Sequence, residues 1–168
     1  MQHCLESWDV IYPSASLKRI AADGNCQFRA LSWALYGTED RHRDVRVSVC
    51  DYMHRNIARY VQYMVDAAAY VSGMRRQGTY GDRVSLQAFC DAYRSNVMVV
   101  SENAVSLVNA RRKSPASYLV VTYHNGCHYN AVTPYHASPT PHFLRQLRPT
   151  LNIENSATLP LSQTRHGR

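Results

Sequence analysis

Apolar side chains recur at spacings of three and four residues through the first half of the chain, which is the pattern of a helix with one buried face. One such stretch follows the turn-forming residues Asp23-Gly24-Asn25 and stops at Gly37. Its apolar positions are Phe28, Ala30, Leu31, Ala34 and Leu35. We therefore predict a helix whose first turn contains Cys26.

Helical patterning continues downstream of this stretch. A longer apolar stripe begins near residues 39–42 and reaches Tyr60, and helical patterning resumes over residues 63–74. After a glycine-containing break, Asp82 is placed to cap a further helix. The apolar positions of that helix are Val84, Leu86, Phe89, Cys90 and Tyr93.

The second half of the chain has a different period. Residues 96–101 and 118–124 are short runs of mainly β-branched and apolar side chains, as buried strands are. Residues 106–117 between them are polar and are predicted to form a loop. Asn125-Gly126 favours a two-residue type I′ turn, so residues 127–132 are predicted to return as a hairpin partner.

Helices combined with a small, mainly antiparallel sheet predict an α+β fold, which we assign to residues 17–136. Residues 16–21, at its start, alternate in polarity and are predicted to approach Cys26 in an extended conformation. Residues 1–16 are predicted to be an irregular lead-in. Residues 137–168 lack periodicity and are rich in Pro, Ser and Thr, so we expect a tail or linker that is wholly or partly disordered.

The composition fits one globular domain, because 45% of the 168 residues are hydrophobic and 18% are charged. No run approaches the roughly 20 apolar residues that span a bilayer. The N-terminus also lacks the basic and apolar regions of a secretory signal. We therefore expect a soluble, intracellular and monomeric protein in the cytoplasm, with no membrane partner.

The net charge of +7 raises the question of nucleic-acid binding. The arginines are scattered over a predicted helix and several predicted loops. Aromatic side chains are not interleaved with them in the way that stacks bases. We do not expect nucleic acid to be the main partner, and RNA binding stays open as an alternative.

The five cysteines are odd in number and lack the regular spacing of a disulfide framework. Most of them fit as small apolar core residues. Cys50 with His54, and His124 with Cys127 and His128, come nearest to a metal-ligand pattern. Neither group supplies the four paired ligands of a structural zinc site, so we expect no metal and no cofactor.

Cys26 and His128 are the candidates for nucleophilic chemistry. The start of a helix favours a negative sulfur, and a glycine-containing turn before it can direct backbone N–H groups at one point, as an oxyanion hole requires. Asn130 projects from the same face of the predicted strand as His128, and its oxygen can accept a hydrogen bond from the ring. The 102 positions that separate Cys26 from His128 mean that only tertiary folding can bring them together.

Three blocks of the sequence resemble the ovarian-tumour (OTU) cysteine proteases, most of which are deubiquitinases. The blocks are residues 23–32 (DGNCQFRALS), residues 78–82 (GTYGD) and residues 128–132 (HYNAV), and they occur in the family's order. They span about two thirds of the chain. The resemblance implies a papain-like domain and acyl transfer at the C-terminus of ubiquitin or polyubiquitin, with ubiquitin-like modifiers as further candidate substrates.

The resemblance also implies roles for individual residues. Cys26 matches the nucleophile, His128 the general base, and Asn130 the residue that orients the base. Asp23 matches the acidic residue that shapes the oxyanion loop, whose backbone amides belong to Asp23, Gly24, Asn25 and Cys26. Tyr80, Asp82 and Tyr129 are candidate substrate-binding residues, and Tyr80 stands where a tryptophan is common in the family.

Other interpretations of the same residues remain open. Cys26 can be an inert buried thiol, Asn130 can satisfy backbone groups, Asp82 can serve only as a helix cap, and Tyr129 can belong to the core. A second enzymatic hypothesis is a viral-type protease that processes its own polyprotein, in which case the location is the host cytoplasm. A catalytically silent module that binds ubiquitin or RNA is a third.

Overall fold

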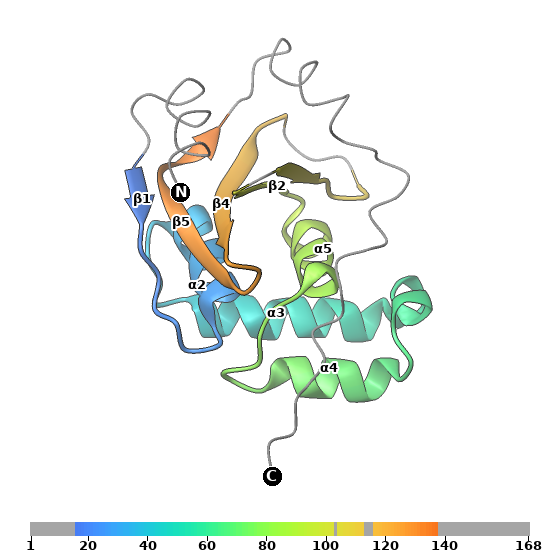
Figure 1. The fold of residues 1–168 in the computed structure, drawn as a ribbon. Helices are drawn as coiled ribbons and strands as arrows, with labels where there is room; N and C mark the ends of the chain where they lie inside the picture. Colours follow the sequence, from blue (N-terminus) through green and yellow to red (C-terminus); the bar gives the residue numbers. More distant parts are fainter. Residues whose placement is uncertain (1–15, 103, 113–115, 138–168) are drawn as a thin grey trace.

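Four α-helices and a five-stranded mixed sheet form the part of the chain that the structure, a computed structural model, describes: residues 16–102, 104–112 and 116–137 (Figure 1). The helices are α2 (Cys26–Tyr36), α3 (His42–Arg55), α4 (Ala67–Arg75) and α5 (Arg83–Tyr93). The strands are β1 (Ser16–Lys18), β2 (Asn96–Ser101), β3 (Val105–Val108), β4 (Tyr118–His124) and β5 (His128–Ala137). This architecture confirms the predicted α+β class.

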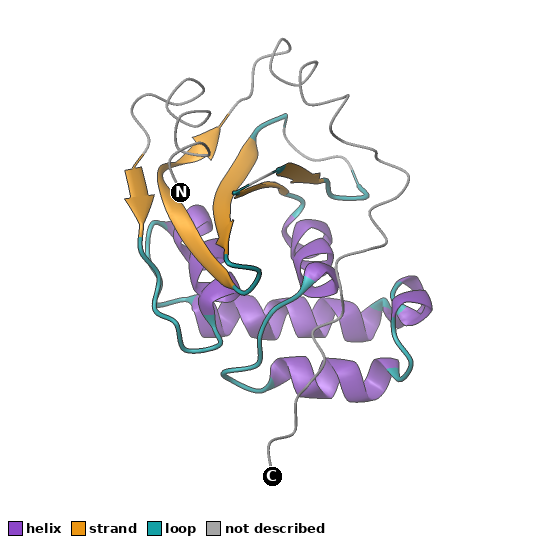
Figure 2. Ribbon diagram, in the orientation of Figure 1, coloured by secondary structure: helices purple, strands orange, loops and turns teal. Residues whose placement is uncertain are grey.

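The sheet has the order β1-β5-β4-β2-β3. All neighbouring strands are antiparallel except β2 and β4, which run parallel. The helices gather on one side of the sheet (Figure 2). Helix α2 packs against β5 and β4, and α3 packs against α2, α4 and α5, so the predicted nucleophile and the predicted base lie on elements in direct contact.

The ends of α2 and α5 follow the sequence signals that predict them. Helix α2 stops at Gly37, whose φ of 71° closes the helix as its N–H donates to the carbonyl of Trp33. Helix α5 begins with a capping box, in which the Asp82 carboxylate accepts from the Ser85 amide and the Ser85 hydroxyl accepts from the Asp82 amide.

The second predicted helix is shorter than its apolar stripe implies. It ends at Arg55, and Asn56 donates from its side chain to the carbonyl of Tyr52, which competes with continued helical bonding. Two short 3-10 turns, Ile57–Arg59 and Val61–Tyr63, follow. Tyr60 remains fully buried and donates to Asp91, so the stripe identified a core residue although the helix had already ended.

The predicted loop over residues 106–117 is wrong at its start, because β3 pairs with β2 there. This edge strand is only partly buried and alternates with polar positions, which hides it within a polar stretch. The Asn125-Gly126 turn has positive φ at both residues, as a type I′ turn requires, but pairing resumes at His128 rather than at Cys127.

The predicted domain boundaries fall close to the ends of the described residues. Ser16, predicted to end the irregular lead-in, belongs to β1, and Ala137, predicted to begin the tail, ends β5. The rest of the predicted lead-in and tail lies outside the described residues. Within the described ranges, no helix combines the length and apolar character needed to cross a membrane.

Helix α3 provides a matched test of the core. Val49 is fully buried, whereas Val47 on the same helix keeps 40% of its surface exposed. We expect Val49→Ala to lower the free energy of unfolding by about 2 kcal/mol, because it removes buried methyl groups and leaves a cavity. Val47→Ala should change it by less than about 0.5 kcal/mol. Urea unfolding followed by circular dichroism measures both, and equal losses would contradict the assigned core.

Candidate active site

Cys26 is the first residue of α2 and is a free thiol with 2% of its surface exposed. The residue before it, Asn25, occupies the N-cap position but makes no side-chain hydrogen bond to the helix. The N–H groups of the first turn therefore keep their capacity to donate to another acceptor. This end of α2 combines a sulfur with backbone donors and the positive end of the helix dipole.

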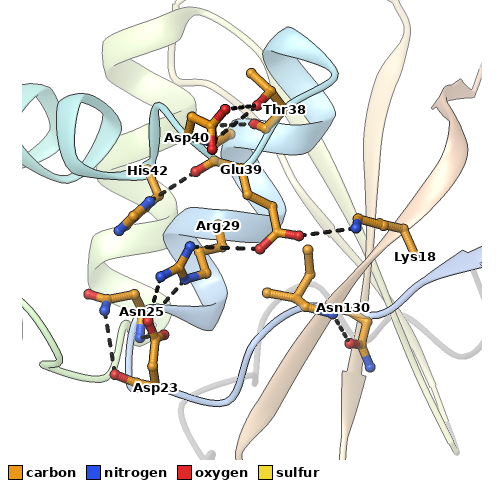
Figure 3. A network of polar contacts seen from close by, with 11 residues as sticks. Lys18, Asp23, Asn25, Arg29, Thr38, Glu39, Asp40, His42 and Asn130 are labelled. Carbon is orange, nitrogen blue, oxygen red and sulfur yellow. Dashed lines mark hydrogen bonds and ion pairs between the residues drawn. The ribbon is translucent and has the colours of Figure 1, made fainter.

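The loop before Cys26 is held by Asp23. One carboxylate oxygen accepts from the Asn25 amide at 3.0 Å, and the other accepts from the Arg29 guanidinium at 2.6 Å (Figure 3). The hydrogen bond from Arg29 holds the pKa of the Asp23 carboxyl well below its ordinary value. Asp23 thus closes the turn locally and ties it to α2.

The Cys26 loop rests directly on the loop at residues 78–82. Gly24 and Gly78 both have positive φ, at 76° and 81°. A Cβ on Gly24 would lie 2.0 Å from the carbonyl oxygen of Gly78, so the two backbones meet where no side chain fits. Gln27 continues the contact, because its side chain donates to the Asp82 carbonyl at 2.9 Å and accepts from the Ser85 hydroxyl at 2.8 Å.

Arg46 is a residue of this site that the sequence argument misses. It lies on α3, is fully buried, and donates to four oxygens in and around the two loops. The acceptors are the Asn25 side chain (2.8 Å) and the carbonyls of Thr79 (2.8 Å), Met74 (2.7 Å) and Gly24 (3.4 Å). The sequence signal that could have identified Arg46 is its position in the helical repeat. Positions 46, 49 and 53 share one helical face, and Val49 and Met53 are apolar and buried.

His128 and Asn130 form a hydrogen-bonded pair on β5. The Nε2 of His128 lies 3.2 Å from the Oδ1 of Asn130, and the backbone N–H of Ile20 donates to the same oxygen at 2.8 Å. Because the Ile20 N–H requires an acceptor, the shared atom of Asn130 is its side-chain oxygen and not its amide nitrogen. An oxygen of this kind only accepts, so His128 donates to it from Nε2. In the neutral ring, Nδ1 is then the nitrogen with a free lone pair.

Asn130 therefore makes both of the contacts considered for it. It accepts from the histidine, and it also accepts from the backbone of the segment that leads to the Cys26 loop. That segment has further anchors, because Lys18 pairs with Glu39 at 3.2 Å and Arg29 reaches the same carboxylate at 3.8 Å (Figure 3). The approach to Cys26 is held from the strand side and from the helix side.

The three predicted substrate-binding residues have different surroundings. Tyr80 is 62% exposed on the 78–82 loop. The Asp82 carboxylate is engaged as a helix cap and also accepts from the Tyr70 hydroxyl at 2.7 Å. Tyr129 is buried and packs against Tyr123 with ring centroids 4.7 Å apart, and burial raises its pKa to about 12.

A cysteine that begins a helix, a histidine that begins the strand packed against that helix, and an asparagine that accepts from the histidine are the elements of a papain-like cysteine protease. The family model of the OTU-like cysteine proteases matches residues 21–135. The chain belongs to this family.

A relative in sequence agrees with this assignment, and solved structures agree with the fold. The chain is 33% identical over 118 residues to OVARIAN TUMOR DOMAIN-containing deubiquitinating enzyme 10 of Arabidopsis thaliana, a match that covers 68% of this chain and 33% of the relative. The chain thus spans about a third of that protein. The OTU domain of OTUD1 superposes with a TM-score of 0.65 at 19% identity, covering 77% of this chain and 92% of that one. An OTU domain in complex with ubiquitin superposes with a TM-score of 0.62 at 20% identity, covering 71% and 69%.

The contact between Gly24 and Gly78 can be tested against a second glycine. Gly126 also has positive φ, but a Cβ there would meet nothing within 4 Å. We expect Gly126→Ala to cost about 1–2 kcal/mol of stability from the left-handed backbone alone. Gly24→Ala should cost about 1–3 kcal/mol more, because it also overpacks the loop contact. Thermal and urea unfolding measure the difference, and equal costs would show that the loops separate easily.

Proposed function

We propose that this protein is a deubiquitinating cysteine protease that hydrolyses the peptide or isopeptide bond at the C-terminus of ubiquitin. The observation that carries the proposal is the hydrogen bond from His128 to Asn130 on the strand against which the Cys26 helix packs. The printed name of the Arabidopsis relative, a deubiquitinating enzyme, and the solved OTU domain bound to ubiquitin support the choice of substrate.

In the proposed reaction, the Cys26 sulfur attacks the carbonyl carbon of the ubiquitin C-terminal glycine after His128 takes the thiol proton. Asn130 holds the ring through Nε2, so Nδ1 is the nitrogen that accepts this proton. The tetrahedral oxyanion is stabilised by backbone N–H groups of Asp23, Gly24 and Cys26, because the Asn25 N–H already donates to the Asp23 carboxylate.

Collapse of the intermediate breaks the C–N bond, and His128 returns the proton to the leaving amine. A thioester between Cys26 and the ubiquitin C-terminus remains. Water then attacks the thioester with His128 again as base, which releases the ubiquitin carboxylate and restores the thiol.

The proposed channel for the ubiquitin tail passes the 78–82 loop. Tyr80 provides exposed aromatic surface there, and the tail ends in two glycines, which a narrow channel accommodates. Asp82 and Tyr129 support this channel indirectly, because Asp82 caps α5 and Tyr129, the second residue of β5, is buried in the core. Their contribution to binding is through the shape of the wall.

A ubiquitin probe with a C-terminal electrophile tests the nucleophile. We expect the wild-type protein to form a covalent adduct of one ubiquitin and Cys26→Ser to form none, because serine is not activated in the same way. Cys127→Ser is the matched control, because Cys127 is the exposed free cysteine among the described residues. Intact-protein and peptide mass spectrometry identify the labelled residue, and an adduct at any cysteine other than Cys26 would refute the assignment.

Substitutions at β5 test the base and its partner. His128→Ala should lower kcat/KM by roughly 10³-fold or more, because the general base is lost. Asn130→Ala should lower it by about tenfold, the effect of one lost hydrogen bond, and should destabilise the fold by about 1–3 kcal/mol because the Ile20 amide loses its acceptor.

Asn130→Asp is the control for these substitutions, since it keeps an acceptor for both donors. It should retain most of the wild-type stability and turnover of a ubiquitin C-terminal fluorogenic amide. If Asn130→Ala turned over this substrate as fast as the wild type, Asn130 would have only its structural role.

A further inference from the structure

Arg46 is an unusual group to find in a protein core. Its side chain is fully buried, and within the described ranges no carboxylate forms an ion pair or hydrogen bond with it. Burial lowers the pKa of its guanidinium, which shows that the surroundings penalise the charge. The compensating contacts are neutral oxygens and the face of Phe28, whose ring centroid lies 4.0 Å from the guanidinium carbon.

Apolar packing alone does not account for this residue. A methionine or leucine of similar volume fills a core without the cost of desolvating a cation, and such replacements of buried ions are often neutral or stabilising. Arg46 supplies what those residues lack, namely several donors that point in different directions from one rigid plane. Its Nη2 donates to Asn25 and Thr79, which belong to the two loops that meet beside Cys26.

Asn25 completes the connection between these loops. Its side-chain oxygen accepts from Arg46 at 2.8 Å and from the backbone N–H of Gly78 at 2.9 Å. The residue directly before the nucleophile is therefore bonded to the proposed wall of the substrate channel. The side chain that would otherwise cap α2 is used for this contact, which leaves the first-turn amides uncapped.

We propose that Arg46, acting through the Asn25 side chain, is a positioning residue that holds the Cys26 loop and the 78–82 loop as one unit. This inference rests on the proposed function. Because the two loops are joined, the amides that stabilise the oxyanion have their geometry before substrate binds. A substrate that contacts the 78–82 loop therefore contacts the same rigid unit that carries the nucleophile.

The position of Arg46 predicts which kinetic constant it affects. It is buried and touches no substrate, so it should contribute little to ubiquitin binding. A loop displaced by about 1 Å costs roughly a hundredfold in the rate of the chemical step. Loss of Arg46 should therefore lower kcat and leave KM nearly unchanged.

The test uses Arg46→Lys, which keeps the charge, together with Asn25→Ala and the double variant. Arg43→Lys is the surface control, because Arg43 is exposed on the same helix. Tyr60→Phe is the core control, because it removes a buried hydrogen bond to Asp91, away from the two loops. Each variant is assayed for kcat and KM on a ubiquitin C-terminal fluorogenic amide, and for stability by urea unfolding.

We expect Arg46→Lys to lower kcat by about a hundredfold with KM changed less than about threefold. Asn25→Ala should act in the same way, and the double variant should be no worse than the poorer single variant, since both changes break one connection. Both controls should keep the wild-type kcat. If Arg46→Lys lowered kcat no more than Tyr60→Phe at similar loss of stability, or if the two losses were additive, Arg46 would be structural only.

A second measurement does not depend on the substrate. Amide hydrogen exchange at Gly78, followed by NMR, reports on the hydrogen bond to Asn25, and it should accelerate about tenfold or more in Arg46→Lys and not in Tyr60→Phe. The wild-type protein could fail to react with ubiquitin while the Gly78 amide still exchanged faster in Arg46→Lys. In that case the proposed function would fail and the connection between the two loops would stand. Unchanged protection of Gly78 in Arg46→Lys would overturn the inference in either case.

Discussion

The hydrogen bond from the Arg46 guanidinium to the Asn25 side chain is the interaction on which the site depends most. It places a cation from α3 against the residue that precedes the nucleophile. The same oxygen of Asn25 receives the Gly78 amide, so a helix and two loops meet at one atom. The geometry around Cys26 is thereby determined by the helical half of the domain as well as by the turn in its own sequence.

The sheet provides an equivalent point at Asn130. Its oxygen accepts from His128 and from the Ile20 amide, and so joins β5 to the segment that runs from β1 to Cys26. Each of these two asparagines uses one carbonyl oxygen to hold two donors from parts of the chain that are distant in sequence.

Local signals were sufficient where the sequence itself determines the backbone. The start of α2 after Asp23-Gly24-Asn25, its end at Gly37 and the capping of α5 by Asp82 follow from turn and capping chemistry and were predicted. The sequence does not reveal β3, because an edge strand carries only a weak pattern. It does not reveal the burial of Arg46 either, because arginine is rarely a fully buried residue. The contacts that join positions 25, 46 and 78 arise only from tertiary packing, and no spacing in one sequence encodes them.

The backbone contact between Gly24 and Gly78 has a consequence for protein engineering. The 78–82 loop lines the proposed substrate channel and is exposed at Tyr80, so it is the natural place to change substrate choice. Yet it cannot be exchanged as a separate module, because its first residue lies where a side chain on the nucleophile loop would have to be. A graft from another member of the family has to bring its own partner for position 24, so the unit of exchange is the pair of loops together.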